Sequence, residues 1–382
     1  MTSRRPRLTP AIADVRRAVR DSLALVRPSG TAAPGRAGTI APNGHNDGSD
    51  APSDLVLVAL SGGADSLALA AATAFEAPRA HLRAGAVIID HGLQDASAEV
   101  AERAAEQARQ LGLDPVVVTR VQVGSGGGPE AAARDARYTA LVNTIQSTDA
   151  AALLLGHTLD DQAETVLLGL ARGSGAGSMQ GMAPVVHAEI RQIGVPDGQE
   201  PPIPGSQRPH LMLRPLLGIR RSTTEAFCAD SGLEPWNDPH NLDPAFTRVR
   251  VRTRVLPMLE DELGPGIALA LARTAEQLRE DEQALDHFAE ELIEDLAEHA
   301  EAGIALAVRG LEANPPALRQ RIIRLAVSAE FGLTLSRAQT LEVARLVTDW
   351  HGQGAVHLPG VRVERHGHLL VFSSASKDRE PH

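Results

Sequence analysis

The stretch LVLVALSGGADSLALAAATAF, residues 55–75, decides the fold. Its first six residues form a continuous apolar run of strand length, Ser61-Gly62-Gly63 provides a turn, and the residues that follow repeat apolar side chains at helical spacing. An apolar strand that leads directly into a helix is typical of a parallel sheet covered by helices on both faces. We therefore predict an α/β fold built around this unit.

The same rhythm continues along the chain. Further strands are expected at residues 84–89, 115–119 and 151–155, and helices at 96–111, 130–146 and 159–171. Crossovers between parallel strands are right-handed, and ligands of such sheets bind at the carboxyl ends of the strands. The functional site is expected at that edge.

The flanking segments differ in composition. Residues 10–27 have helical periodicity, and 28–53 are rich in Gly and Pro, as in a mobile linker. After a Gly- and Pro-rich stretch at 173–210, further helices are expected at 220–231, 246–260, 316–330 and 336–350, with short strands at 355–358, 361–365 and 369–372. Residues 264–300 form one long acidic helix or a helical hairpin. The predicted domains are 1–53 (helix and linker), 54–255 (α/β domain), 256–300 (acidic helical connector) and 301–382 (small α+β module).

Composition excludes several classes of protein. Cys228 is the only cysteine among 382 residues, so no intrachain disulfide and no all-cysteine metal site can form. The only lysine is Lys377, followed by Asp378, so a Walker A loop is excluded. The chain has no run of roughly 20 apolar residues and no signal-peptide pattern, which predicts a cytoplasmic protein without a membrane span.

The strongest local signal is the loop Ser61, Gly62, Gly63, Ala64, Asp65 and Ser66. Glycines let the backbone approach a phosphate, while hydroxyls and amides at a helix N-terminus point at an anion. The alternative is a simple turn in which Ser61 or Asp65 caps the helix. The full six-residue pattern after a buried strand favours nucleotide binding.

A second group of polar residues follows the strand expected at 151–155. His157, Asp161 and Glu164 share one face if they lie on a helix, and clustered carboxylates near a phosphate loop suit Mg²⁺. The alternative is that Asp160 and Asp161 favour the helix dipole while Glu164 is solvated. The phosphate loop nearby favours the metal interpretation.

Two further sites allow either a functional or a purely structural interpretation. Arg134 or Arg137 could neutralise charge developing on a phosphate, or Arg134 could pair with Glu130 within the helix. Asp90, at the end of the second strand, stands where an adenosine or ribose would lie, or it caps a turn.

The charge of −11 argues against a nucleic-acid partner, but it is unevenly distributed. Residues 276–301 carry eleven acids against Arg279, whereas 208–254 carry eight arginines against five acids. Arginines recur at every second position from 248 to 254. On a helix only some of them would reach a polyanion, while others would pair with Asp238, Asp243 or Glu260.

Together these residues resemble the PP-loop ATP pyrophosphatases, whose signature is SGGxDS, and within them the bacterial tRNA(Ile)-lysidine synthetase family. The similar blocks, in the family's order, are SGGADS at Ser61, DHGLQ at Asp90, EAAARDARY at Glu130, LGHTLDDQAETVLLGLARGSG at Leu155, RPLLGIRR at Arg214 and DPHNLDPAFTRVRVRTRVLPML at Asp238. Many members carry Arg-Asn-Arg-Ile-Arg where this chain has Arg248-Val-Arg250-Val-Arg252.

The resemblance implies ATP-dependent adenylation of the wobble cytidine of a CAU-anticodon tRNA(Ile), followed by attack of free L-lysine, with release of pyrophosphate and AMP. It implies catalytic roles for Asp65, Arg134, Asp161 and Glu164, with Mg²⁺ on Asp65, Asp161 and Glu164. ATP would contact the loop from Ser61 to Ser66, together with Asp90 and His157. Arg214, Arg248 and Arg252 would contact tRNA, and a homodimer is left open.

Three other functions are compatible with parts of the pattern. tRNA thiolation by PP-loop enzymes typically needs paired cysteines, and Cys228 stands alone. Amide-forming relatives share only the loop. A non-catalytic nucleotide sensor would keep the loop without needing Asp161 and Glu164. Pyrophosphate release that depends on lysine and tRNA separates all three from lysidine formation.

Overall fold

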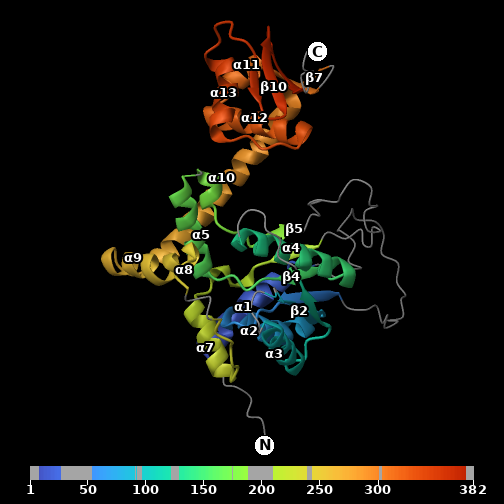
Figure 1. Ribbon diagram of the computed structural model, residues 1–382, viewed down its shortest axis with the longest axis vertical. Coiled ribbons are helices and arrows are strands. Elements are labelled where there is room, and N and C mark those ends of the chain that lie inside the picture. Colours follow the sequence, from blue (N-terminus) through green and yellow to red (C-terminus); the bar gives the residue numbers. More distant parts are fainter. Residues whose placement is uncertain are drawn as a thin grey trace, which may run out of the picture. The chain divides into compact units, whose positions relative to one another are not determined.

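The computed structural model describes residues 8–26, 54–90, 92, 97–121, 129–173, 175–187, 210–238, 243–300 and 303–375 (Figure 1). The expected linker and most of the Gly- and Pro-rich stretch lie outside these residues. The chain divides into two compact units, residues 1–276 and 277–382. The domain boundaries expected at 53, 255 and 300 remain predictions about folding units.

The first unit contains a sheet of six strands. In chain order they are β1 (Leu55–Ala59), β2 (Arg83–Asp90), β3 (Val116–Arg120), β4 (Ala152–Leu154), β5 (Val185–His187) and β6 (Leu211–Leu213). Their spatial order is β3-β2-β1-β4-β6-β5, with all neighbours parallel except β5, which is antiparallel to β6. The predicted α/β fold and its first four strands are confirmed. The sequence analysis missed β5 and β6.

Helices cover both faces of this sheet. One core packs α1 (Pro10–Leu23), α2 (Ala64–Glu76), α3 (Ser97–Gln110) and α7 (Arg221–Ser231) against Val56 and Val58 of β1. Leu55 and Leu57, on the opposite face of the same strand, pack with Leu141 and Ile145 of α4 (Pro129–Thr148). Alternate side chains of β1 therefore enter two different cores, which explains its continuous apolar sequence.

A helical region extends the first unit beyond the sheet. It comprises α5 (Leu159–Arg172), α6 (Ala176–Met179), α8 (Thr247–Arg250), a π-helical turn (Val251–Val255), α9 (Leu256–Glu262) and the start of α10 (Ile267–Leu296). Leu159 and Ala163 of α5 pack with Val251, Leu256 and Ala268. The helix expected at 246–260 is therefore present with a π-helical turn inside it, and α10 is one helix rather than a hairpin.

The second unit is an α+β module, as predicted. Its antiparallel sheet has the order β7-β8-β11-β10-β9, formed by β7 (Ala297–Ala300), β8 (Gly303–Ala307), β9 (Val356–Leu358), β10 (Val361–His366) and β11 (Leu369–Ser374). The helices α11 (Val308–Ala313), α12 (Pro316–Phe331) and α13 (Arg337–Thr348) share a core with this sheet. The elements β7, β8 and α11 were not expected from the sequence.

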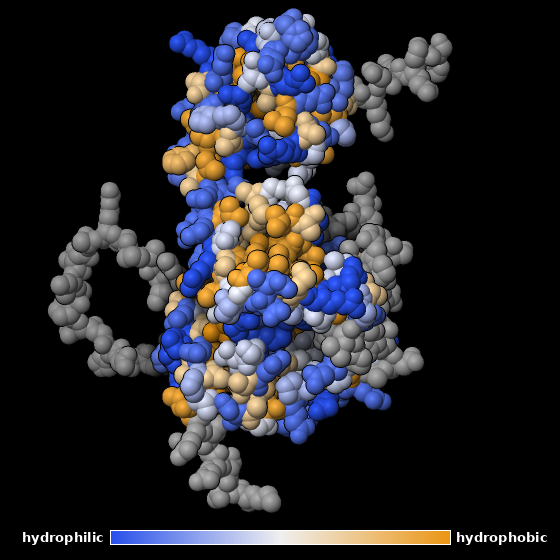
Figure 2. All heavy atoms as spheres, turned by 90° about the vertical axis from the view of Figure 1, so that its left-hand side faces the viewer, coloured by the Kyte–Doolittle hydropathy of each residue, from blue (hydrophilic) through white to orange (hydrophobic). Residues whose placement is uncertain are grey.

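The face of the molecule shown in Figure 2 carries both polar and apolar side chains. Large apolar side chains are exposed at Leu170 on α5, at Met258 on α9 and at Leu263, which directly follows α9. Among the described residues, no helix is both long enough and apolar enough to span a membrane.

Candidate active site

The predicted phosphate loop joins β1 to α2 at the carboxyl edge of the sheet. Gly62 has a φ of +84°, a conformation that favours glycine, and its carbonyl accepts a hydrogen bond from the Trp236 amide at 2.9 Å. The Ser66 hydroxyl accepts from the Ser61 amide at 3.1 Å and donates to the Gly63 carbonyl at 3.0 Å. Gly63 caps α2 without a side-chain hydrogen bond, so the N-terminus of α2 is suited to an anion.

A second glycine holds this loop close to the one after β4. A methyl group on Gly156 would lie 3.1 Å from Ser66 Cα, 3.2 Å from Ser66 N and 3.3 Å from the Asp65 carbonyl carbon. These distances are shorter than ordinary van der Waals contact with backbone atoms. Glycine at this position therefore allows direct backbone contact between the phosphate loop and the loop that carries His157.

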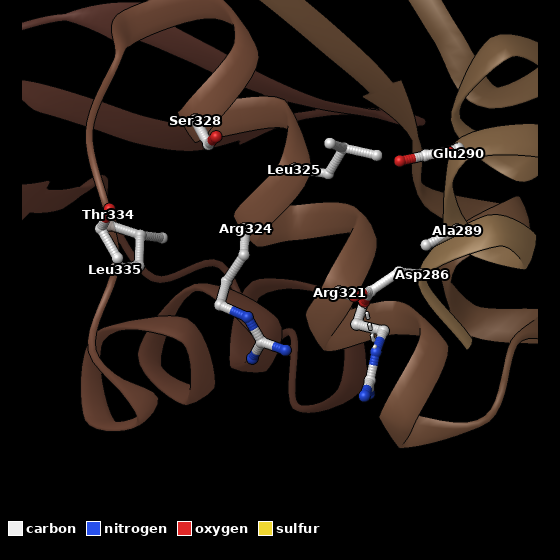
Figure 3. Close-up of a pocket in the computed structure, with 9 residues that line it drawn as sticks. All are labelled: Asp286, Ala289, Glu290, Arg321, Arg324, Leu325, Ser328, Thr334 and Leu335. Atoms are coloured by element: carbon white, nitrogen blue, oxygen red, sulfur yellow. Dashed lines mark hydrogen bonds and ion pairs between the residues drawn. The ribbon is translucent and has the colours of Figure 1, made fainter. Parts of the chain in front are cut away.

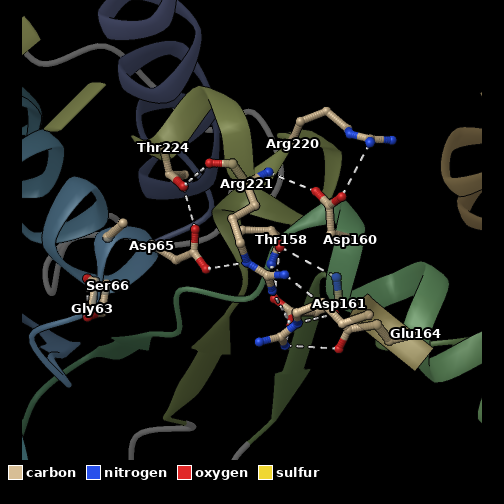
Figure 4. Close-up of polar contacts among 12 residues, drawn as sticks. Gly63, Asp65, Ser66, Thr158, Asp160, Asp161, Glu164, Arg220, Arg221 and Thr224 are labelled. Atoms are coloured by element: carbon tan, nitrogen blue, oxygen red, sulfur yellow. Dashed lines mark hydrogen bonds and ion pairs between the residues drawn. The ribbon is translucent and has the colours of Figure 1, made fainter. Parts of the chain in front are cut away.

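Asp161 begins α5 in a capping box. The Thr158 amide and hydroxyl each donate to Asp161 Oδ2 at 2.8 Å, and the Thr158 hydroxyl accepts from the Asp161 amide at 3.4 Å. Asp161 therefore does cap the helix, as the structural alternative predicted, but capping uses only one of its carboxylate oxygens. The second oxygen, Oδ1, turns toward Arg221 (Figure 4).

Arg221, at the start of α7, connects three carboxylates that are distant in the sequence (Figure 4). Its Nε donates to Asp65 Oδ2 at 3.2 Å, and its Nη2 to Asp161 Oδ1 at 2.9 Å. Its Nη1 lies 3.4 Å from Glu164 Oε1. The Thr224 hydroxyl, one turn further along α7, donates to the other oxygen of Asp65. Arg221 is therefore the centre of the site.

Two more arginines bind Glu164, which is fully buried. Arg248 Nε donates to Oε2 at 2.8 Å, while Arg252 Nε donates to Oε1 at 2.7 Å and Arg252 Nη2 to Oε2 at 3.1 Å. The two arginines are four positions apart across the start of the π-helical turn, which presents both guanidinium groups to one carboxylate. We call Asp65, Asp161, Glu164, Arg221, Arg248 and Arg252 the ion-pair cluster.

The ion-pair cluster changes the expectation for the arginines of residues 248–254. Arg248 and Arg252, which were expected to contact tRNA, are engaged with Glu164 rather than with Asp238, Asp243 or Glu260. Arg250 donates to the carbonyls of Pro244 and Ala245. The helical conformation predicted for this segment is confirmed, and helical spacing explains why these side chains diverge.

Burial and neighbouring charge move the carboxyl groups in opposite directions. Burial raises the pKa of Asp65, although the hydrogen bond from Thr224 and the charge of Arg221 oppose it. Burial also acts to raise the pKa of Asp161, but Arg221 and the Thr158 amide outweigh it, and the result is a lowered pKa. The charges of Asp161, Asp65 and Glu164 outweigh burial at Arg221 and raise its pKa.

A cavity of about 140 Å³ adjoins the ion-pair cluster. Its lining mixes acids, arginines and apolar side chains: Asp160, Glu164, Arg220, Arg221, Arg252, Leu256, Pro257, Glu260 and Ala268. Asp160 Oδ2 accepts from the Arg221 amide at 2.8 Å and Oδ1 lies 3.4 Å from Arg220 Nη2. A small ligand that carries both an amine and a carboxylate matches this lining.

The other expected site residues lie around the same edge of the sheet. His157 precedes α5 rather than sharing its helical face, and burial, with Arg214, Arg137 and Arg248 nearby, lowers its pKa to about 3 against the charge of Asp161. Arg134 is exposed on α4. Asp90 ends β2, where Oδ1 accepts from the Gly92 amide at 2.9 Å, so the turn cap left open as the alternative to a nucleoside contact is present.

The three carboxylates of the site differ in how well they fit Mg²⁺. No group of three or more His, Cys, Asp or Glu side chains within the described ranges is arranged to hold a metal. Asp65 and Asp161 nevertheless direct one oxygen each to the same guanidinium group, and Mg²⁺ needs only one or two carboxylates when phosphate oxygens and water complete its shell. Both oxygens of Glu164 accept from arginines. Asp65 and Asp161 therefore fit the ion better than Glu164.

Arg221 and Thr224 were not among the site residues expected from the sequence. Arg221 stands in the block RPLLGIRR, beside Arg220, and no periodicity distinguishes the arginine that turns into the site from its neighbour. The available signal was position: Arg221 is the first residue of a helix, and Thr224 follows three residues later on the same face.

The second unit has a larger cavity, of about 330 Å³, between α10 and α12 (Figure 3). Arg321 on its wall is paired with Glu282 at 2.5 Å and Asp286 at 2.9 Å. Burial and the charge of Arg321 lower the pKa of Arg324, which also lines this cavity. These contacts tie α12 to α10, and none of them involves the residues expected to act on ATP.

Comparison with known proteins agrees with this arrangement. A family model described as the PP-loop domain matches residues 43–259, and one described as the TilS substrate binding domain matches residues 306–370. The sheet order, the loop from Ser61 to Ser66 and the match over more than half of the chain define an enzyme of the PP-loop, ATP-binding class.

Relatives make the assignment more specific. The chain is 64% identical to the tRNA(Ile)-lysidine synthase of Leifsonia xyli subsp. xyli over 84% of its own length and 90% of that protein. It is 50% identical to that of Streptomyces coelicolor over 83% and 85%, and 37% identical to that of Tropheryma whipplei over 96% and 98%. The chain belongs to the tRNA(Ile)-lysidine synthase family, and it is a ligase that forms a carbon–nitrogen bond.

A solved structure supports the fold. The U34-tRNA thiolase NcsA from Methanococcus maripaludis, described with its [4Fe-4S] cluster, is similar at a TM-score of 0.50 and 16% identity, over 71% of this chain and 80% of that one. Cys228, the chain's single cysteine, is buried. The likeness therefore concerns the architecture of the sheet and helices.

Proposed function

We propose that this chain joins the ε-amine of free L-lysine to C2 of the wobble cytidine in a CAU-anticodon tRNA(Ile). In the first step the cytidine O2 attacks the α-phosphorus of ATP and pyrophosphate leaves. In the second the lysine nitrogen attacks C2, AMP leaves with O2, and the amine loses a proton. The observation that carries the proposal is the contact between the phosphate loop and the ion-pair cluster, in a chain 64% identical to a lysidine synthase.

The loop from Ser61 to Ser66 binds the phosphates of ATP in this proposal. Gly62 and Gly63 let the backbone approach them, and the N-terminus of α2 faces their negative charge. Asp90 stands at the neighbouring strand end, where the nucleoside would lie. When bound, Mg²⁺ on Asp65 and Asp161 would neutralise charge on the pyrophosphate leaving group. Arg134 stays our candidate for charge stabilisation at the α-phosphate.

Lysine is assigned to the cavity of about 140 Å³ beside Glu164. Asp160 and Glu260 supply negative charge for its amines, while Arg220 and Arg221 supply positive charge for its carboxylate. Because the cavity shares Arg221 with Asp65, the amine would be held next to the phosphate loop.

The tRNA must present its wobble base at the carboxyl edge of the sheet. Reaction at C2 requires the base to leave the anticodon stack, as in other enzymes that modify bases. Arg214 is our candidate for a phosphate contact at this edge, and we place the reaction in the cytoplasm. A homodimer is not required by this geometry.

The direct test is mass spectrometry of the wobble nucleoside. Purified protein is incubated with ATP, Mg²⁺, isotope-labelled lysine and a tRNA(Ile) transcript with a CAU anticodon, and we expect labelled lysidine together with lysine-dependent AMP formation. Asp65→Ala, a helix-compatible change, should remove the product without unfolding the chain. Pyrophosphate release by the wild type without any lysidine would contradict the proposal.

A further inference from the structure

A second polar cluster lies at the same edge of the sheet, on the face covered by α4. Arg137 and Tyr138 belong to α4, His157 follows β4, and Arg214 directly follows β6. Because β4 and β6 are parallel neighbours, with Leu154 opposite Leu213, His157 and Arg214 leave the sheet at one edge. We call Arg137, Tyr138, His157 and Arg214 the α4 cluster.

Three polar atoms of the α4 cluster are buried without a well-formed hydrogen bond. The Tyr138 hydroxyl, His157 Nδ1 and Arg214 Nε form no hydrogen bond of ordinary geometry among the described residues, although the guanidinium groups of Arg137 and Arg214 lie close enough to act on the Tyr138 hydroxyl. The opposite end of Arg214 is fixed, because its Nη1 donates to the Ala183 carbonyl at 2.7 Å. Buried polar groups in native proteins are normally satisfied, and each exception calls for an explanation such as a missing ligand. Three exceptions in one cluster indicate a binding site.

The cluster also concentrates positive charge. Arg137 and Arg214 act electrostatically on both Tyr138 and His157, and Arg134 and Arg137 lie 4.9 Å and 5.5 Å from the centre of the Tyr138 ring. Within the part of the chain that the structure describes, neither Arg137 nor Arg214 forms an ion pair with a carboxylate. Burial lowers the pKa of Arg137. A ligand that completes this site must be an anion that accepts hydrogen bonds.

We propose that the α4 cluster binds one of the two backbone phosphodiesters that flank the wobble cytidine. This inference rests on the proposed function. The phosphates of ATP already have the loop that starts α2, which packs on the opposite face of the sheet from α4. A phosphodiester at the α4 cluster would leave the attached base beside His157 and therefore close to Asp161. The site would fix the nucleotide at the carboxyl edge of the sheet, beside the residues that bind ATP and lysine.

The test uses an anticodon stem-loop of tRNA(Ile) in which either flanking phosphodiester is replaced by an uncharged methylphosphonate. Binding of the unmodified and the two modified stem-loops is measured by fluorescence anisotropy over a range of salt concentrations, and ATP binding is measured separately. The proteins are the wild type, Arg137→Gln and Tyr138→Phe. Arg109→Gln is the matched control, because it removes the same charge from an exposed site on α3.

We expect Arg137→Gln to weaken binding of the unmodified stem-loop about tenfold and to lower the slope of log affinity against log salt by roughly 0.7, with ATP affinity unchanged. One methylphosphonate should weaken wild-type binding by a similar factor but add little in the variant, because both changes remove the same contact. Arg109→Gln should retain the full methylphosphonate effect. Tyr138→Phe should show a smaller effect of the same kind.

Loss of ATP affinity with an unchanged salt slope would overturn the proposal, and so would additive effects of Arg137→Gln with both methylphosphonates. If Arg137→Gln does not fold, the same comparison of unmodified and methylphosphonate stem-loops is made with Tyr138→Phe, which removes only a hydroxyl. The two proposals can fail separately. A wild type that makes no lysidine but keeps the coupling between Arg137 and one phosphate refutes only the reaction, whereas lysidine formation without that coupling refutes only the phosphate site.

Discussion

The ion-pair cluster and the α4 cluster use the same kind of side chain in opposite ways. In the ion-pair cluster, Arg221, Arg248 and Arg252 all contact buried or half-buried carboxylates of the chain itself. In the α4 cluster, Arg137 and Arg214 have no carboxylate partner within the described part of the chain. A count of arginines in the sequence therefore does not locate an RNA surface; what decides is whether each guanidinium group is paired.

This difference separates stability from ligand binding. Paired charges inside a protein are costly to break, because removal of one partner leaves the other buried and uncompensated. Unpaired buried donors lower stability until a ligand satisfies them. Changes at the fully buried Glu164 should thus affect folding and activity together, whereas changes in the α4 cluster should affect binding first.

The largest effect is expected from Glu164→Gln. It leaves Arg221, Arg248 and Arg252 without their shared fully buried carboxylate, and it should lower the free energy of unfolding by about 3 to 5 kcal/mol. Urea denaturation followed by circular dichroism measures this loss. Glu234→Gln is the control, because its exposed pair with Arg103 should contribute less than about 1 kcal/mol. Equal losses in both variants would remove the distinction between the clusters.

Arg221→Gln should act mainly on the reaction. Asp65 keeps the hydrogen bond from Thr224, and Asp161 keeps its capping box, so we expect a stability loss of only about 1 to 2 kcal/mol. Lysidine formation should fall by at least about 100-fold, because the charge that joins the phosphate loop to α5 is lost. Single-turnover assays with saturating ATP, lysine and tRNA measure it. An Arg221→Gln enzyme as active as Arg109→Gln would exclude Arg221 from the site.

A pH experiment tests the burial of His157. Its folded pKa, about 3, lies below the unfolded value near 6.5, so the unfolded state binds more protons between these values and stability falls as pH decreases through this window. Between pH 6.5 and 4.5 the contribution of one such group amounts to roughly 2 kcal/mol. We expect the free energy of unfolding of His157→Gln to fall less than that of the wild type over this range. If the free energies of unfolding of the two proteins fall equally with pH, His157 is accessible to protonation in the folded state.

The smallest effect concerns Cys228, on the other side of the phosphate loop from the α4 cluster. Burial, with the charge of Asp65 nearby, raises the pKa of its thiol to about 12, and Sγ donates to the Ala64 carbonyl at 3.4 Å. At pH 8 the native protein should react with iodoacetamide far more slowly than the same protein in urea, since only the thiolate reacts. Mass spectrometry over time measures both rates, and similar rates would mean that α7 opens readily from α2.

Much of the fold could be predicted from the sequence because its elements carry strong local patterns. Apolar runs fixed β1 to β4, and helical periodicity located α2 to α5 within a few residues. The strands β5 and β6 have three residues each, too few for a pattern, and β6 is recognised only by its pairing with β4. Similarly, β7 and β8 are short and follow an acidic helix without a turn signal between α10 and β7.

The candidate site could be predicted only in part. The phosphate loop and the carboxylates Asp161 and Glu164 stand in compact local motifs, and the structure brings them together through Arg221. The partners of Arg221 lie 57 to 156 residues away in the sequence, so no local pattern could reveal that role. The same holds for Arg248 and Arg252, whose partner Glu164 lies 84 and 88 residues earlier.

Gly156 couples the movement of the phosphate loop to that of the loop after β4. Because its missing side chain lets the loop after β4 rest on the backbone of Asp65 and Ser66, neither loop can shift without moving the other. A displacement produced by a triphosphate at α2 would therefore be transmitted to His157 and Asp161 as a rigid translation rather than absorbed by side-chain rotation. On this basis the two loops form one moving part, and they are joined at a position that contributes no functional group at all.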